Sequence, residues 1–183
     1  IAKAVAGPVA IDGVQIETEK VWRFLREHRI PTIVFINKMD KERASFDIIE
    51  AVKGDLKANI AAVALPVGAA ESFSGVVDLL EMKAYSPKGD GKDSTVTDVP
   101  ADLKSEAESL RGSLIETAAE GDDALIEKFL DGGQLTEEEI TSGLKSLIAD
   151  AKLVPAVFGS ATKAIGVKNL LNVIRKYAPA PAA

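Results

Sequence analysis

Two apolar runs that each lead into a short polar loop constrain the fold of this chain more than any other feature. Residues 33–36 lead directly into the loop 37–40, Asn-Lys-Met-Asp, and residues 153–158 lead into 159–161, Gly-Ser-Ala. Short apolar runs bounded by polar residues are typical of buried strands. The loops that follow parallel strands meet at one edge of an open α/β sheet. The sequence therefore predicts a parallel sheet with a ligand site between these two loops.

The side chains of these loops fit the hydrogen-bonding edge of guanine. A carboxylate at Asp40 can accept two hydrogen bonds, from N1 and from the N2 amino group, and adenine offers no such pair of donors. A backbone N–H near Ala161 can donate to O6, which adenine replaces with an amino group. The stem of Lys38 can lie over the ring while its ammonium group stays in water. The amide of Asn37 can hold neighbouring loops together and touch the base.

Each of these residues also has an ordinary structural interpretation. Asn37 could be a turn-forming residue after a strand, Lys38 a surface lysine, and Asp40 or Ser160 a helix cap. A bare Asn-Lys-x-Asp would be weak evidence for a site. Here a buried strand precedes the loop, a helix follows it, and a second loop stands at another strand end. This context favours the ligand-binding interpretation.

Residues 37–40 and the pair Ser160-Ala161 resemble the two base-recognition motifs of GTPases. The surrounding segment 35–46, FINKMDKERASF, resembles translation elongation factor G and its close paralogues. Residues 68–80, GAAESFSGVVDLL, resemble the start of the subdomain that elongation factor G inserts into its G domain. Residues 159–163, followed by Gly166-Val167, resemble its return to the core. The resemblance covers nearly the whole chain.

This resemblance implies a fold, a ligand and a setting. The fold is α/β, part of a doubly wound sheet of the P-loop GTPase type with an inserted α+β subdomain. The ligand is GTP or GDP, and Ser160 would orient the second loop. The setting is a cytoplasmic GTPase of the translocation class that acts on the ribosome. The residues that would bind guanine are Asn37, Lys38, Asp40, Ser160 and Ala161.

The parts of a GTPase that handle phosphate have no counterpart in this sequence. It contains no G-x-x-x-x-G-K-[ST] phosphate loop, and it lacks the family's switch threonine and D-x-x-G-H segment. The resemblance therefore implies the carboxyl-side part of a G domain, with no catalytic residue and no metal ligand in this chain. Mg²⁺ would be bound only in the parent protein, and we expect this chain alone not to hydrolyse GTP.

Charge divides the chain into three sections. Residues 1–59 carry 10 basic and 9 acidic side chains, residues 60–151 carry 7 and 19, and residues 152–183 carry 5 and none. This pattern predicts a separate acidic module over 60–151, and the resemblance implies that it is the subdomain inserted between two parts of the G-domain core. Its field should repel nucleic-acid phosphate and attract basic protein surfaces. By resemblance the partner would be the ribosomal stalk protein, although a merely solvated acidic face is the alternative.

Two other functions stay open. The chain could be a noncatalytic module that docks a protein through its acidic section, or part of a ribosome-protection or release-type GTPase. Other classes are excluded by composition. The chain has no cysteine, which rules out disulfides and thiolate metal sites, and no apolar run approaches the ~20 residues of a membrane span. We expect no membrane contact and no direct DNA binding.

Helical spacing predicts a helix over 18–29 and a last helix over 167–177. Between them, the stripe from Leu103 to Ala118 and a shorter pattern at Leu125 and Phe129 predict two more helices. Thr136 and Glu139 predict a capping box at the start of another. The residues expected to face inward in the first and last helix are Val21, Phe24, Leu25 and His28, and Val167, Leu170, Leu171, Ile174 and Tyr177.

The middle section also contains strand patterns. Residues 62–65, 75–80 and 95–99 are apolar or β-branched, and a polar, hairpin-like loop over 86–94 separates the last two. Residues 1–12 are apolar but interrupted by Gly7-Pro8, which is a turn signal, so their structure stays ambiguous.

Overall fold

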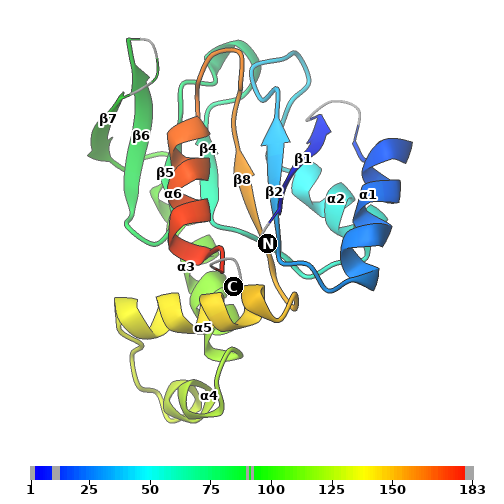
Figure 1. The fold of residues 1–183 in the computed structure, drawn as a ribbon. Helices are drawn as coiled ribbons and strands as arrows, with labels where there is room; N and C mark the ends of the chain where they lie inside the picture. Colours follow the sequence, from blue (N-terminus) through cyan, green and yellow to red (C-terminus); the bar gives the residue numbers. More distant parts are fainter. Residues whose placement is uncertain (1–2, 10–12, 90, 92, 180–183) are drawn as a thin grey trace.

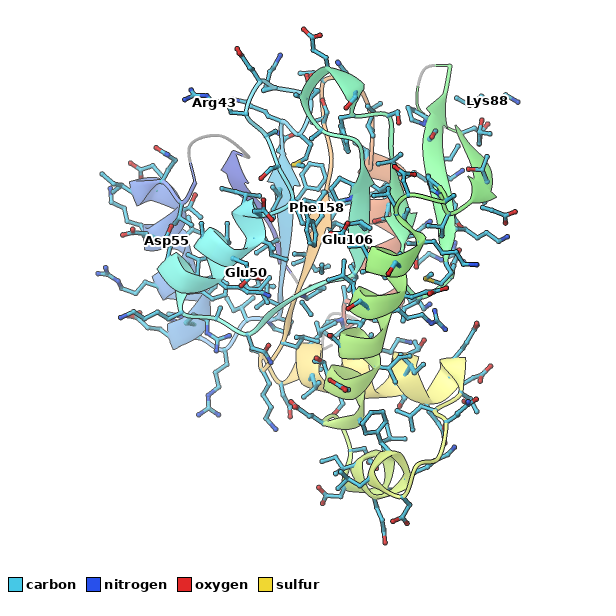
Figure 2. The ribbon with its side chains drawn as sticks, turned by 180° about the vertical axis from the view of Figure 1, so that it is seen from behind. Arg43, Glu50, Asp55, Lys88, Glu106 and Phe158 are labelled. Carbon is cyan, nitrogen blue, oxygen red and sulfur yellow. The ribbon has the colours of Figure 1, made fainter. Side chains whose placement is uncertain are left out.

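The computed structural model describes residues 3–9, 13–89, 91 and 93–179. Its centre is a four-stranded parallel sheet in the order β1-β2-β8-β3. Comparison of Figures 1 and 2 shows α6 on one side of this sheet and α2 on the other. The predicted α/β class is confirmed. The elements of this part are β1 (Lys3–Val9), α1 (Ile16–Glu27), β2 (Thr32–Asn37), α2 (Ile48–Leu56), β3 (Ile60–Ala62), β8 (Val154–Phe158) and α6 (Val167–Tyr177).

The two central strands form the core because they are apolar on both faces. All five residues of β8 are buried, as are the first five of β2. Parallel strands covered on both faces have such continuous apolar runs. Phe158 is 0 % exposed and lies in the interior in Figure 2, whereas Arg43, Glu50 and Asp55 point outward. The prediction that these two runs are buried strands of one parallel sheet is therefore confirmed, and the structure adds that they are neighbours.

A separate antiparallel sheet has the order β4-β5-β6-β7. It starts one residue after β3, and the intervening Val63 donates its N–H to the carbonyl oxygen of Ala156 at 3.1 Å. The chain thus passes directly from the parallel sheet into the antiparallel sheet. In Figure 1, β6 and β7 lie at the side of the antiparallel sheet that is turned away from β2. The strands are β4 (Ala64–Val67), β5 (Gly75–Asp78), β6 (Lys83–Lys88) and β7 (Asp93–Asp98).

The polar, hairpin-like loop predicted over 86–94 does lie in a hairpin, between β6 and β7, but its bounds are wrong. The pairing of β6 with β7 runs as far as Lys88 opposite Asp93. The strand β7 is an exposed edge strand, so this end of the sheet buries few side chains and β6 lacks a clear alternation of apolar and polar residues. Pro87 further weakens the sequence pattern of a strand. The predicted strands 75–80 and 95–99 are confirmed with shifted ends. The predicted strand 62–65 is divided at Val63 between two sheets.

Three helices follow the antiparallel sheet and carry the acidic section, and Figure 1 shows α5 and α4 below the two sheets. The capping box is confirmed, since Glu139 N–H donates to Thr136 Oγ1 at 3.3 Å and Thr136 N–H to Glu139 Oε2 at 2.7 Å. Lys128 pairs with the same Glu139 at 2.8 Å. The helices are α3 (Lys104–Ala119), α4 (Asp123–Leu130) and α5 (Glu137–Ala149). The apolar residues that α3 and α5 bury include Ala107, Leu114, Ala118, Ile140, Leu144, Leu147 and Ile148.

The predicted inward faces of the first and last helix are partly wrong. In α1 the structure buries Trp22 together with Leu25, and leaves Val21 and Phe24 about half exposed. The indole fixes this rotation, because Trp22 Nε1 donates to the carbonyl oxygen of Leu56 at 2.9 Å. His28 is exposed as well.

In α6 the structure buries Tyr177 as predicted, but the other two buried residues are Asn169 and Val173. Leu171 is exposed. The polar residue turns inward because Asn169 Nδ2 donates to Asp78 Oδ2 at 3.3 Å, a contact that an apolar pattern does not include. Hydrophobic periodicity therefore places the helix but not its rotation.

The division at 59/60 and 151/152 stays a prediction. The strand β3 follows residue 59 and pairs with β8 in the parallel sheet, so the antiparallel sheet itself begins only at Ala64. Of the ambiguous segment 1–12, residues 3–9 form the edge strand β1, and residues 1–2 and 10–12 lie outside the described residues. Within the described part of the chain, no helix is long and apolar enough to cross a membrane.

Candidate functional site

The two polar loops lie side by side at the carboxyl ends of β2 and β8. Ile36 pairs with Phe158 in the sheet, so both loops begin at the same level, and Figure 1 shows them at the upper edge of the parallel sheet. Two backbone hydrogen bonds join them: Gly159 N–H donates to the Ile36 carbonyl at 2.9 Å, and Met39 N–H donates to the Gly159 carbonyl at 3.1 Å. Residues distant in sequence thus form one surface.

Asn37 adds a side-chain connection between the loops. Its Oδ1 accepts a hydrogen bond from Lys38 N–H at 2.8 Å and from Ala161 N–H at 2.9 Å. The amide therefore holds both loops, which is the role that the sequence suggested. One consequence concerns the base: the N–H of Ala161 already has a partner, so its donation to O6 would have to be shared with Asn37. A donor to O6 near Ala161 remains a prediction.

Asp40 is the chemically informative residue of the site. It is buried, with only 7 % of the residue exposed. Its Oδ2 lies 3.5 Å from Lys41 Nζ, whereas Oδ1 is buried and has no hydrogen-bond partner among the described residues. A buried carboxylate oxygen without a partner costs more than the ~1–3 kcal/mol of a neutral group. A ligand with two adjacent N–H donors would remove that cost.

The electrostatics of the loops keep Asp40 ionised. The pKa of Asp40 is lowered from its ordinary value, chiefly by hydrogen bonding of the carboxylate to the Ser160 side chain and to a smaller extent by Asp40's own backbone amide and by Lys41, while burial acts in the opposite direction. The ionised carboxylate accepts hydrogen bonds and donates none. At neutral pH the Asp40 carboxylate is therefore purely a hydrogen-bond acceptor.

Ser160 is fully buried and shapes the second loop from within. Its Oγ lies 3.2 Å from Thr162 Oγ1 and accepts from Lys163 N–H at 3.3 Å. Its backbone exchanges two hydrogen bonds with Ile165, at 2.9 and 3.0 Å. Because α6 begins at Val167, Ser160 does not cap that helix. The contacts support a loop-orienting role, which the sequence had implied only through the family resemblance.

Lys38 is exposed and has a left-handed backbone, with φ of 65°. Such a conformation costs an L-residue roughly 1–2 kcal/mol, and non-glycine residues held this way are concentrated at functional sites. The Asn37 amide, which accepts the Lys38 N–H, helps to hold it. The exposed side chain of Lys38 is compatible with the prediction that its aliphatic stem lies over the ring of the base.

Gly159 and Gly166 make the site possible, although the sequence patterns placed them only within motifs and gave neither a role of its own. A Cβ atom on Gly159 would lie 2.5 Å from the Ile165 carbonyl oxygen and 2.6 Å from the Phe35 ring. Gly166 has φ of 74°, and a Cβ there would lie 2.1 Å from the Phe158 carbonyl oxygen. The sequence did contain a signal for this close packing. A glycine stands on each side of residues 160–165, and glycine is the residue that lets two backbone segments approach closely.

The described residues around these loops offer few metal-ligating side chains. Within the described residues, no group of three or more His, Cys, Asp or Glu side chains is placed to hold a metal ion. Asp40 is accompanied by Lys41 rather than by a second carboxylate. These residues therefore do not fit Mg²⁺, and the chemistry that they offer is recognition through hydrogen bonds.

Comparisons with known proteins agree with this geometry. A sequence family described as the elongation factor Tu GTP binding domain matches residues 4–180. Among solved structures, the crystal structure of a protein from Thermus thermophilus matches with a TM-score of 0.88 and 28 % sequence identity. The match covers 98 % of this chain and 27 % of that protein. The chain thus spans about a quarter of the length of the solved protein that it matches.

Proposed function

We propose that this chain, which belongs to the elongation factor Tu GTP-binding domain family, reads the guanine base in a translational GTPase of the elongation factor G class. Family membership implies guanine nucleotide as the ligand. The translocation class, the ribosome as partner and the cytoplasmic setting are parts of the proposal. The segments 35–46 and 68–80 and the inserted antiparallel sheet support them. A close paralogue or a release-type GTPase is the alternative within the family.

One observation carries the proposal: Asp40 is ionised, and its Oδ1, at the junction of two joined loops, has no hydrogen-bond partner in the part of the chain that the structure describes. Guanine presents N1–H and the N2 amino group side by side, and one carboxylate can accept both. Adenine has an unprotonated N1 and a C2–H at the corresponding positions, so it would leave Oδ1 unpaired. The site therefore discriminates through the penalty for a buried acceptor without a donor.

The remaining residues take complementary roles. Asn37 holds the two loops at a fixed separation through its contacts with Lys38 and Ala161. The stem of Lys38 covers one face of the base. Ser160 holds the second loop in place through the hydrogen bond that its Oγ accepts from Lys163 N–H. The charge-assisted phosphate contacts that dominate nucleotide affinity, and the Mg²⁺ that phosphoryl transfer requires, come from parts of the parent protein outside this sequence.

We expect the 183-residue chain to bind GDP weakly but with base specificity, and not to release phosphate from GTP. Base contacts are present, whereas residues for phosphate cradling and Mg²⁺ are missing from the sequence. An NMR titration with GDP should shift the backbone amides of 37–40 and 160–161, and the same titration with ADP should not. Sub-micromolar affinity, or phosphate release that follows the chain through purification, would contradict this expectation.

The acidic section supports a second candidate function, a docking surface for a basic protein. Residues 60–151 have a net charge of −12, and Glu137 and Glu138 are exposed at the start of α5. In a translational GTPase, the proposed partner is the ribosomal stalk protein. This candidate can hold together with guanine binding, because it uses a different face of the chain.

Stalk-protein binding to this chain should weaken as salt is raised, since exposed charges are screened over ~10 Å at 0.1 M ionic strength. Replacing Glu137 and Glu138 by glutamine should lower the affinity measured by calorimetry and flatten its salt dependence. The matched control replaces Glu17 and Glu19, which are exposed on α1 in the core section, and should change neither quantity. Equal effects of both pairs would rule out docking through the acidic section.

A further inference from the structure

We infer that the turn 68–73, which joins β4 to β5 in the antiparallel sheet, positions the guanine-reading loop 37–40, and that Ser72 is the positioning residue. This inference rests on the proposed function, because it concerns the same site. It goes beyond that function by giving the inserted section a part in base recognition. The segment lies outside both base-recognition motifs, so neither motif indicates such a role.

The turn touches the loop through its backbone. Ala70 N–H donates to the carbonyl oxygen of Met39 at 3.0 Å, and Met39 N–H donates to Gly159 at 3.1 Å. The peptide groups on both sides of the Met39 Cα are therefore held, one by each neighbouring segment. The Met39 side chain is also 0 % exposed. Because Asp40 follows directly, a displacement of the turn moves the peptide group that carries the base-reading carboxylate.

The turn has a conformation that needs support. Ala70 has a left-handed backbone with φ of 52°, and Gly68 has φ of 73°. A Cβ atom on Gly68 would lie 2.4 Å from the Ser72 carbonyl oxygen, so the chain folds tightly back on itself. A left-handed alanine persists only where its surroundings hold it there.

Ser72 supplies that support. Its Oγ donates to the carbonyl oxygen of Ala69 at 2.7 Å and accepts the Ala69 N–H at 3.2 Å. Both peptide polar groups of Ala69 are thereby bound to one hydroxyl, directly before Ala70. The side chain itself is exposed, so its hydrogen bonds matter more than its packing. Without this hydroxyl, the Ala69 carbonyl keeps the backbone N–H of Ser72 at 3.1 Å but the Ala69 N–H loses this acceptor. The turn is then held less firmly, and the Ala70 donor can leave Met39.

The other side of the turn is attached to the antiparallel sheet. Ser74 N–H donates to the Val67 carbonyl at 3.0 Å, and Val67 pairs with Gly75 where β4 meets β5. Phe73 is 3 % exposed and joins the main apolar core. The turn is thus a short rigid bridge from the antiparallel sheet to the base-reading loop. In Figure 1 this connection lies at the same edge as the loops that follow β2 and β8.

The experiment compares GDP with IDP in the complete parent protein. Inosine lacks the N2 amino group, so the ratio of the two affinities reports how well Asp40 is placed against that donor. Ser72→Ala should lower this ratio roughly five-fold, which corresponds to about 1 kcal/mol. Ser72→Thr keeps the hydroxyl and should restore the ratio. Glu71→Ala, in the same turn and exposed, is the matched control and should leave the ratio unchanged.

The outcomes separate this inference from the proposed function. If the unsubstituted protein does not prefer GDP over IDP, the proposed function fails and this inference fails with it. If the protein prefers GDP and Ser72→Ala keeps the full ratio, only the positioning role is overturned. A general loss of stability would weaken both nucleotides alike and leave the ratio unchanged, which also counts against the inference.

A second measurement needs no substitution. Saturating GDP should slow hydrogen exchange of the Ala70 N–H in the unsubstituted protein, because the base holds the loop that accepts this bond. The Gly133 N–H, which donates to Lys128 at 2.9 Å in the helical part, serves as the reference and should not change. Equal behaviour of the two amides would contradict a contact between the turn and the base-reading loop that responds to the ligand.

Discussion

In the complete parent protein, Asp40→Asn should shift base preference from guanine toward xanthine. Xanthine has a carbonyl in place of the N2 amino group, so the Asp40 carboxylate opposes one acceptor with another. An amide presents one acceptor and one donor, which fits xanthine and mispairs with guanine. A buried polar group left unpaired costs roughly 1–3 kcal/mol, more when it is charged, and ~1.4 kcal/mol is tenfold in affinity. The GTP-to-XTP affinity ratio should therefore change by at least about one order of magnitude.

The fold should tolerate this substitution, because Asp40 Oδ1 has no hydrogen-bond partner to lose among the described residues, and an amide of the same shape keeps one oxygen for Ser160 and Lys41. The control is Asp55→Asn, an equal loss of charge at an exposed position on α2, where the side chain points outward (Figure 2). It should leave the ratio as it is. If the Asp40 variant is folded and its ratio also stays unchanged, Asp40 does not read the base and the central proposal is wrong.

Gly166→Ala should be the most destabilising of the single changes considered, by roughly 2–5 kcal/mol in free energy of unfolding. Two costs combine. The left-handed backbone at φ of 74° costs an alanine roughly 1–2 kcal/mol, and overpacking typically adds about 1–3 kcal/mol. The overpacking is severe here because the added Cβ meets backbone atoms, the Phe158 carbonyl at 2.1 Å and Gly159 Cα at 3.0 Å. Urea denaturation of the 183-residue chain measures the loss.

Gly132→Ala separates the two costs. Gly132 has φ of 79°, close to that of Gly166, but no atom lies within 4 Å of a Cβ added there. The Gly132→Ala variant should therefore lose only the part of the free energy of unfolding that comes from the left-handed backbone conformation. A second consequence is local: Gly166→Ala pushes on the Phe158–Gly159 segment and should also shift the NMR signals of 37–40, whereas Gly132→Ala should not. Equal losses in the two variants would show that the close approach at Gly166 carries no free energy.

Several features of the fold and of the candidate site could be predicted from local sequence alone. The apolar runs before residues 37 and 159 specify buried strands, and a loop at the end of each follows from the polar residues. The capping box at Thr136 and Glu139 was correct because all of its partners lie within one helical turn. The last helix was predicted with the bounds that the structure has, Val167 to Tyr177. In each case, the deciding interactions join residues close in sequence.

The errors have a common physical origin in contacts between distant segments. Trp22 and not Val21 faces inward in α1 because the indole reaches the Leu56 carbonyl. Asn169 is buried in α6 because it donates to Asp78 on β5. Hydrophobic periodicity records which residues are apolar, but it does not record a polar partner on another element.

What the sequence by itself determined about this protein is the kind of residue at each strand end, and with it the prediction of a guanine-reading carboxylate. Only the tertiary structure decided how those residues meet. The register of Ile36 with Phe158 sets both loops at one level, burial leaves Asp40 Oδ1 without a partner among the described residues, and the turn at Ala70 reaches the Met39 carbonyl. These features depend on packing between segments far apart in the chain, where the free energy of one contact depends on the placement of all the others.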